Sequence, residues 1–140
     1  MSAECTFCAI ARGVTTAPVV FEDESAMAFL DHRPLFPGHV LLIPKQHVET
    51  LGELRPESVG PLFEHARRLS IAVEQALGAE GSFVAVNNRV SQSVPHLHIH
   101  VVPRKRKDGL RGFFWPRTKY HDAEAVESVR VSLRDALLRM

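Results

Sequence analysis

This sequence has few cysteines, little net charge and no long apolar run, and each shortage excludes a class of protein. Its 140 residues contain two cysteines, Cys5 and Cys8, too few for the disulfide framework of a small secreted domain. The formal net charge is +1, so no overall field directs the chain to nucleic acid or a membrane surface. No apolar run is long enough to cross a bilayer, and the first residues do not read as a secretory signal. We therefore expect a cytoplasmic protein with no nucleic-acid or membrane partner.

The sequence also lacks internal repeats and low-complexity stretches. With 45% hydrophobic and 24% charged residues, it has the balance of an ordinary globular protein, and its length suffices for one hydrophobic core. We predict a single domain over residues 1–140. Its core is expected at about 5–104, followed by a basic and aromatic segment and a helix over 105–140.

Apolar spacing divides the chain into several short strands and one long helix. Short apolar runs bounded by turn residues predict strands at Val19–Glu22, Ala26–Asp31, His39–Pro44, Ser82–Val86 and Val94–Val102. Three- and four-residue spacing predicts a helix from Ser58 to Leu77 with Pro61 in its first turn, and shorter helices are expected at 6–12 and after Asp122. Because strands outnumber helices and mostly follow one another, the expected class is α+β, an antiparallel β-sheet with the long helix on one face.

Three histidines alternate with aliphatic residues in the predicted strand near residue 100. Side chains alternate between the two faces of a strand, so His96, His98 and His100 share one face and the intervening aliphatic residues share the other. Imidazole can act as a nucleophile, a proton carrier or a metal ligand near neutral pH. The segment therefore points to chemistry rather than to packing alone.

From the residues alone, three interpretations of this segment stay open. The first is a sheet face that carries histidines without chemistry. The second is a zinc-dependent hydrolase that uses His98 and His100 with Asp31. Neighbouring histidines on one face are roughly 7 Å apart and could share a metal, whereas the outer pair, at roughly 13 Å, could not. The third is nucleophilic catalysis, in which the central imidazole attacks an electrophile such as phosphorus.

The stretch His96–Val102 resembles the signature of the histidine triad (HIT) nucleotide hydrolases and transferases, in which three histidines alternate with hydrophobic residues. The resemblance extends upstream to Phe29-Leu30-Asp31, to Pro37–Lys45 with His47, and to Gln92-Ser93-Val94. It covers most of residues 5–104 and implies the α+β fold of that family. It also implies a homodimer.

The resemblance implies a two-step reaction without a catalytic metal. His98 is expected to attack the α-phosphate of a purine nucleotide derivative, either a dinucleoside polyphosphate or a nucleoside phosphoramidate, and water then cleaves the nucleotidyl-histidine. His100 is expected at the phosphate oxygens or the bridging oxygen. His39 would be the family's fourth histidine and complete a hydrogen-bond relay. The alternatives are a non-catalytic nucleotide-binding or regulatory module and the zinc-dependent hydrolase.

Substrate-binding residues follow from the same resemblance. Asp31 is expected to accept hydrogen bonds from the ribose hydroxyls, and Asn87 to contact ribose or phosphate. Gln92 and Ser93 are expected to donate to a phosphate or to the leaving group. Candidates for the lining of the base pocket are Phe7, Ile10, Phe21, Phe29 and Leu30.

A structural zinc site is implied by the family branch that has two cysteines near the N-terminus. The matching ligands are Cys5, Cys8, His47 and His96, a closed tetrahedral set that would remove His96 from catalysis. Two free thiols or a redox pair are the alternatives.

Two segments depart from the family pattern. The loop of residues 87–92 is shorter than usual and has no glycine, so we expect backbone conformations with positive φ to be less accessible there. Arg89 could supply a charged contact instead. Downstream, the basic run Arg104–Lys107 could hold a polyphosphate, and the aromatic group Phe113–Arg117 could seal the core, close a dimer or contact the substrate.

Overall fold

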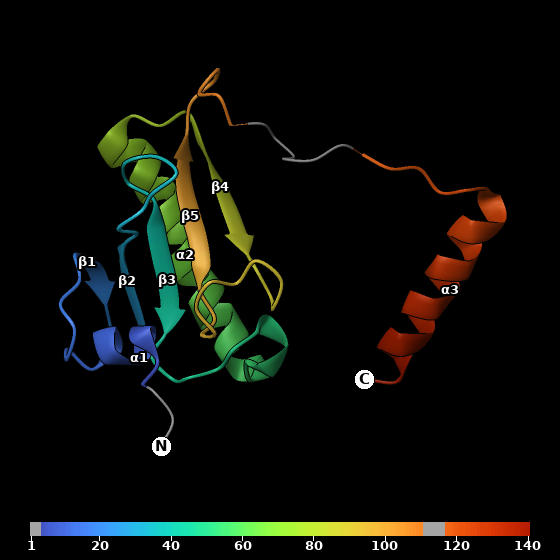
Figure 1. Ribbon diagram of the computed structural model, residues 1–140, viewed down its shortest axis with the longest axis horizontal. Coiled ribbons are helices and arrows are strands. Elements are labelled where there is room, and N and C mark those ends of the chain that lie inside the picture. Colours follow the sequence, from blue (N-terminus) through green and yellow to red (C-terminus); the bar gives the residue numbers. More distant parts are fainter. Residues whose placement is uncertain (1–3, 111–116) are drawn as a thin grey trace. The chain divides into compact units, whose positions relative to one another are not determined.

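The computed structural model describes residues 4–110 and 117–140, which fall into two compact units divided after Asp108. The first unit is built on a five-stranded antiparallel sheet in the order β1-β2-β3-β5-β4 (Figure 1). Its strands are β1 (Val19–Glu22), β2 (Ala26–Leu30), β3 (Val40–Pro44), β4 (Gly81–Val86) and β5 (Ile99–Arg104). Its helices are α1 (Thr6–Ala11), the short 3-10 helix η1 (Leu51–Glu53) and the long α2 (Pro56–Leu77). The α+β prediction is confirmed.

The second unit contains α3 (Ala123–Leu138). The Asp122 side chain caps this helix, because its Oδ1 accepts the N–H of Ala125 at 2.8 Å. Four apolar residues at helical spacing are 43–66% exposed, namely Val126, Val129, Leu133 and Leu137. No helix within the described ranges combines the length and the apolar character needed to span a membrane. That both units form one domain stays a prediction.

Local signals in the sequence explain where most elements begin and end. In the β1–β2 turn, Asp23 Oδ1 accepts the backbone N–H groups of Ser25 and Ala26 at 2.9 and 2.8 Å. Helix α2 starts at Pro56, two residues before the predicted Ser58, because proline has no N–H and suits the first position of a helix. The Pro61 that we expected in the first turn therefore lies one turn further on.

Two apolar clusters pack on opposite faces of the sheet. Leu97, Ile99 and Val101 are fully buried in the cluster under α2. The second cluster lies on the other face with α1, and it consists of Phe7, Met27, Phe29, Leu41 and Ile43. The aliphatic residues of the triad segment, His96–Val102, thus point to α2. Its histidines point to the opposite face, where α1 lies, as strand alternation predicts.

Strand β5 begins five residues later than the sequence predicts. The predicted strand started at Val94, but the pairing of β5 with β3 ends where Ile99 faces Leu42. The pairing of β5 with β4 ends at the same residue, where Ile99 faces Val86, and the Leu97 N–H bonds the carbonyl of Val48 at 2.7 Å instead. His96 and His98 therefore lie outside the sheet ladder, and the backbone carbonyl of His96 accepts a hydrogen bond from the His98 side chain.

Candidate functional site

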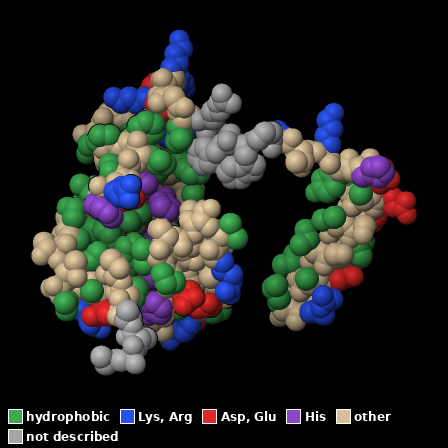
Figure 2. All heavy atoms as spheres, viewed as in Figure 1, with side chains coloured by type: hydrophobic (Ala, Val, Ile, Leu, Met, Phe, Trp, Pro, Cys, Tyr) green, Lys and Arg blue, Asp and Glu red, His purple; other side chains and the backbone are tan. Residues whose placement is uncertain are grey.

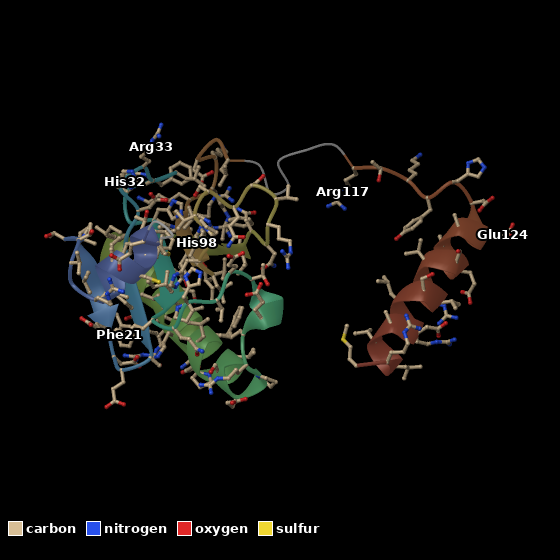
Figure 3. The ribbon with its side chains drawn as sticks, turned by 60° about the horizontal axis from the view of Figure 1, so that its bottom comes forward. Phe21, His32, Arg33, His98, Arg117 and Glu124 are labelled. Atoms are coloured by element: carbon tan, nitrogen blue, oxygen red, sulfur yellow. The ribbon has the colours of Figure 1, made fainter. Side chains whose placement is uncertain are left out.

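Histidine side chains lie together with hydrophobic ones on the face of the first unit shown in Figure 2. His98 lies among the packed elements, whereas His32 and Arg33 project from the turn after β2 (Figure 3). His96 and His98 are buried, with 0% and 3% of their surface exposed. Buried polar groups need hydrogen-bond partners, so the partners of each ring show which nitrogen carries the proton.

The partner of His98 fixes its tautomer. Its Nδ1 lies 2.7 Å from the backbone carbonyl oxygen of His96, which can only accept, so Nδ1 carries the proton and donates. In the neutral ring, Nε2 is then left with its lone pair. The Phe7 ring packs nearly perpendicular to His98, with the ring centroids 5.1 Å apart. The neutral form of His98 therefore has its lone pair on Nε2.

A second chain of hydrogen bonds orients His100. The Leu35 N–H donates to His39 Nδ1 at 3.1 Å, so His39 carries its proton on Nε2 and donates it to His100 Nδ1 at 2.9 Å. His100 must then carry its own proton on Nε2. Within residues 4–110 and 117–140 that buried Nε2 has no hydrogen-bond partner. This series of hydrogen bonds thus ends in the buried Nε2–H of His100, which can donate to an oxygen of a bound substrate.

Burial favours the neutral forms of His39 and His100. Burial, and secondarily the neighbouring His98 and His39, lowers the pKa of His100 to about 4. Burial also lowers the pKa of His39, although the carboxylate of Asp31 acts in the opposite direction. One carboxylate oxygen of Asp31 lies 3.8 Å from His39 Nε2.

Asp31, His39 and His100 place their ligand atoms within 4.8 Å of one another, a spacing that would also suit a metal ion. The hydrogen bond from Leu35 argues against that use. With Nδ1 of His39 already accepting an N–H, a metal on Nε2 would require a fully deprotonated ring. We therefore describe this cluster as a hydrogen-bonded relay.

Cys5, Cys8, His47 and His96 form a second cluster, with all four ligand atoms within 4.8 Å of one another. His96 Nδ1 lies 3.4 Å from Cys5 Sγ, 3.5 Å from Cys8 Sγ and 3.3 Å from His47 Nδ1. Zinc bound tetrahedrally at about 2.3 Å to sulfur and about 2.0 Å to nitrogen keeps its ligand atoms roughly 3.3–3.8 Å apart. The spacing of the cluster fits such an ion.

The protonation of the cluster also fits a cation. His96 Nε2 donates to the carbonyl oxygen of Pro44 at 2.8 Å, so Nδ1 presents its lone pair to the two sulfurs. Burial, with the neighbouring Cys5, raises the pKa of the Cys8 thiol. A divalent cation would reverse that effect by stabilising the thiolate. The chemistry of these four donors therefore fits a closed zinc site.

Residues 12–107, more than half of the chain, match the HIT domain family. This chain belongs to the HIT domain family. Several solved HIT structures share its fold, including a HIT family protein of Bacillus subtilis (TM-score 0.85, 30% identity, 95% of this chain and 96% of that chain). A zinc-bound histidine triad protein of Mycobacterium smegmatis has a TM-score of 0.73 and 34% identity over 97% of each chain.

Curated HIT relatives include named enzymes. Adenylylsulfatase HINT3 of Arabidopsis thaliana is 38% identical over 109 residues, which cover 76% of this chain and 55% of that protein. An adenosine 5'-monophosphoramidase of Schizosaccharomyces pombe is 34% identical over 80% of this chain and 83% of that protein. The chain thus spans about half of the first relative and most of the second.

In this HIT fold, the predicted substrate residues lie on two loops, one after β2 and one between β4 and β5. Asp31 follows β2, and its Oδ1 accepts the N–H of Arg33 at 2.9 Å. Asn87 directly follows β4 and is exposed. Ser93 lines an open cavity of about 760 Å³ beside the cysteine and histidine cluster.

Both ends of the Gln92 amide are engaged within the protein. Its Oε1 accepts the N–H of Arg89 at 2.8 Å, and its Nε2 donates to the carbonyl oxygen of Glu49 at 2.6 Å. Asn88 Oδ1 accepts the Leu51 N–H at 2.8 Å. These bonds tie the loop of residues 87–92 to the segment after β3, which also carries His47.

The expectation about the backbone of this loop is wrong. Arg89 and Ser91 both have positive φ, at 70° and 62°, although neither is glycine. Such residues persist where surrounding contacts over-determine the backbone. Here the Gln92 side chain accepts the N–H of Arg89. This hydrogen bond holds a backbone conformation that glycine would adopt with less strain.

Sequence reasoning missed three groups and misplaced one. It gave no role to the Leu35 N–H or the Pro44 carbonyl, because a sequence does not show which backbone groups bond to side chains. The packing of Phe7 against His98 was also missed, although its position between two cysteines was a signal. Phe21 packs on the α2 side of the sheet, with its ring 4.5 Å from His65, so it does not share the cluster of Phe7 and Phe29.

Part of the basic run forms ion pairs within the protein. Arg104 pairs with Asp108 at 2.6 Å, and Arg106 pairs with Glu80 at 2.9 Å, so two of the four cations in the basic run have acidic partners. The aromatic group lies outside the described residues except for Arg117.

Proposed function

We propose that this protein cleaves a purine nucleotide derivative at its α-phosphate through a nucleotidyl-histidine formed on His98 Nε2. The observation that carries the proposal is the bond from His98 Nδ1 to the carbonyl oxygen of His96, because it leaves Nε2 unprotonated and able to attack. The names of the curated relatives support a reaction on a nucleotide phosphorus.

In the first step, the Nε2 lone pair forms a bond to phosphorus while the bond from phosphorus to the leaving group breaks. Positive charge develops on the His98 ring, and the carbonyl that accepts its Nδ1–H stabilises that charge. The Nε2–H of His100 donates to a phosphate oxygen or to the departing atom. In the second step, water attacks the same phosphorus and releases a proton to solvent, the bond to Nε2 breaks, and the nucleoside monophosphate leaves with the neutral ring restored.

The remaining residues bind or orient the substrate in this proposal. Asp31 accepts hydrogen bonds from the ribose, and Asn87 contacts ribose or phosphate. Ser93 donates to the phosphate or the leaving group. Gln92 acts on the same phosphate through the loop that its amide holds in place. Dinucleoside polyphosphates and nucleoside phosphoramidates are the proposed substrate classes, and the relatives that are named as a tetraphosphatase and a phosphoramidase support them.

Cys5, Cys8, His47 and His96 hold a structural zinc in this proposal, which places the protein in the zinc-binding branch of the family. A bound zinc would supply a fixed crosslink between α1, the segment after β3 and the start of the triad. Catalysis uses no metal. The protein acts as a homodimer, and residues 1–140 form one functional domain.

The experiment compares the wild-type protein with His98→Ala and His98→Asn on diadenosine polyphosphates and on AMP phosphoramidate, with and without chelator. The proposal expects turnover in the wild type, none above background in either variant, and no loss on brief chelation of a protein that stays folded. Normal turnover by His98→Ala would contradict it. Nucleotide binding without turnover would indicate a binding module, and chelator-sensitive turnover without unfolding would indicate a zinc-dependent hydrolase.

A further inference from the structure

An open cavity between β1 and α2 is not used by the proposed reaction. It has a volume of about 430 Å³, and Phe21, His65 and Arg68 are among the residues that line it. Phe21 was a sequence candidate for the base pocket, but it packs with the cluster on the α2 side of the sheet (it is labelled in Figure 3). The triad histidines point to the opposite face. This cavity is therefore separate from the candidate active site.

Contacts within the protein hold the aromatic wall of the cavity in place. His65 Nε2 donates to Asp23 Oδ2 at 3.0 Å, and the ring centroids of His65 and Phe21 are 4.5 Å apart. The other carboxylate oxygen of Asp23 accepts two backbone N–H groups in the β1–β2 turn. His65 thus connects α2 to this turn, and it positions the Phe21 ring beside the cavity.

Arg68 brings a cation to the cavity that has no acidic partner. Its guanidinium carbon lies over the Phe21 ring, 5.8 Å from the ring centroid. Six of the eight arginines in residues 4–108 pair with Asp or Glu, including Arg67, the neighbour of Arg68 on α2. Arg33, the other exception, projects from the turn after β2. Among the described residues, Arg68 has no hydrogen bond or ion pair, so its N–H donors are available to an anion.

Most of the remaining lining is aliphatic. Val20 and Ile71 are 51% and 39% exposed, so a ligand that covers them removes apolar surface from water. Leu69 and Ala72 extend the aliphatic lining, and Gln75 adds a neutral amide. Arg68 is the only lysine or arginine among the described residues of the lining. A matching ligand therefore combines an aliphatic part with a single negative charge.

We propose that this cavity binds a small aliphatic carboxylate, of the kind represented by a medium-chain fatty acid anion. The two carboxylate oxygens pair with the planar N–H donors of Arg68, and the alkyl chain covers Val20 and Ile71. A phosphate monoester carries a second charge that the lining does not neutralise, so the carboxylate is the better match. The volume is that of an ordinary small-molecule site. Binding here is independent of the proposed reaction at His98.

The test uses octanoate as the probe, and octanamide, which has the same chain without the charge, as its comparison. Proton–carbon NMR of the full-length, methyl-labelled protein reports on Val20, Leu69 and Ile71. Octanoate should shift these methyl signals saturably with a Kd of about 1 mM or tighter, and octanamide should bind about tenfold more weakly or less. The methyl signals of Leu41 and Ile43, on the other face of the sheet, should not shift.

Three variants at exposed positions of α2 show which side chains hold the ligand. Arg68→Gln removes the cation and should lower the affinity for octanoate to that for octanamide. Arg67→Gln is the matched control, because Arg67 pairs with Glu64 on the same helix, and it should leave both affinities unchanged. Ala72→Phe fills part of the cavity and should weaken the binding of both compounds.

Equal affinities for octanoate and octanamide, or an unchanged octanoate affinity in Arg68→Gln, would overturn the inference. It is also overturned if octanoate has no effect and the same methyl signals shift with protein concentration, because a second copy of the chain then covers the cavity. The titrations contain no nucleotide, so their result does not depend on the proposed function.

Discussion

The three histidines of the triad segment differ in which ring nitrogen carries the proton. His96 and His98 each donate to a backbone carbonyl, but from opposite nitrogens, Nε2 in His96 and Nδ1 in His98. His100 instead accepts on Nδ1 from His39. Three residues of the same type thus become a candidate metal ligand, a candidate nucleophile and a hydrogen-bond donor, because each ring contacts a different backbone or side-chain partner.

The buried relay predicts that acid destabilises the protein. The unfolded chain binds a proton at His100 below its ordinary pKa of 6.5, whereas the folded protein does so only near about 4. The unfolded state therefore binds more protons between these values, so the free energy of unfolding falls as the pH is lowered through that window. Urea titrations from pH 7 to pH 4.5 should show a loss of about 1–3 kcal/mol that depends on His100.

His100→Gln is the comparison for this prediction. The glutamine oxygen can still accept the N–H of His39 but cannot titrate, so the variant should lose less stability over the same range. Acid release of a metal would affect both proteins alike. Parallel curves for the two proteins would show that His100 is not the group responsible.

The hydrogen bond from His39 to His100 predicts that a substitution of His39 lowers kcat. In His39→Phe the ring volume is nearly kept, but His100 Nδ1 loses its donor and the proton is free to leave Nε2. We expect kcat to fall by about 10–100-fold with KM nearly unchanged, and His39→Gln to recover part of the loss. Steady-state kinetics on AMP phosphoramidate measure this, and an unchanged kcat in His39→Phe would remove the relay from the mechanism.

At the level of elements, local patterns are readable from the sequence and long-range ones are not. The alternation of Leu97, Ile99 and Val101 is a property of adjacent residues, and it correctly gave the face that packs under α2. The start of β5 depends on where its pairing with β3 and β4 ends, and the hydrogen bond that the Gln92 amide donates depends on Glu49, 43 residues away. Neighbouring residues in the sequence do not reveal these long-range contacts, so the strand boundary and the backbone of the loop were predicted wrongly.

The loop of residues 87–92 predicts an unusual response to glycine. Arg89 has positive φ, which costs a side-chain-bearing residue about 1 kcal/mol or more, so Arg89→Gly relieves strain that offsets the added entropy of the unfolded chain. Val90 is not among the positive-φ residues, so Val90→Gly should be destabilising by about 0.5–1 kcal/mol. Thermal unfolding of both variants tests this, and equal losses of stability would contradict the strained backbone at Arg89.

At the scale of the whole molecule, α3 has apolar residues that its own unit leaves uncovered. A helix with an apolar stripe that is 43–66% exposed is favoured when another surface covers it. The family resemblance predicted a homodimer, and a second copy of the chain is one surface that would cover this stripe. Sedimentation equilibrium should give about twice the chain mass of 15.6 kDa, and a mass near 15.6 kDa at micromolar concentration would count against the dimer.

The covalent adduct is the most direct test of the account. The protein is mixed with AMP phosphoramidate, quenched within the first turnover, and digested for peptide mass spectrometry under conditions that preserve the bond between phosphorus and nitrogen. The account predicts an adenylyl group on His98 in the wild type and in His39→Phe, and none in His98→Asn. An adduct on another residue, or rapid turnover with no adduct at any quench time, would contradict the central claim that His98 Nε2 is the nucleophile.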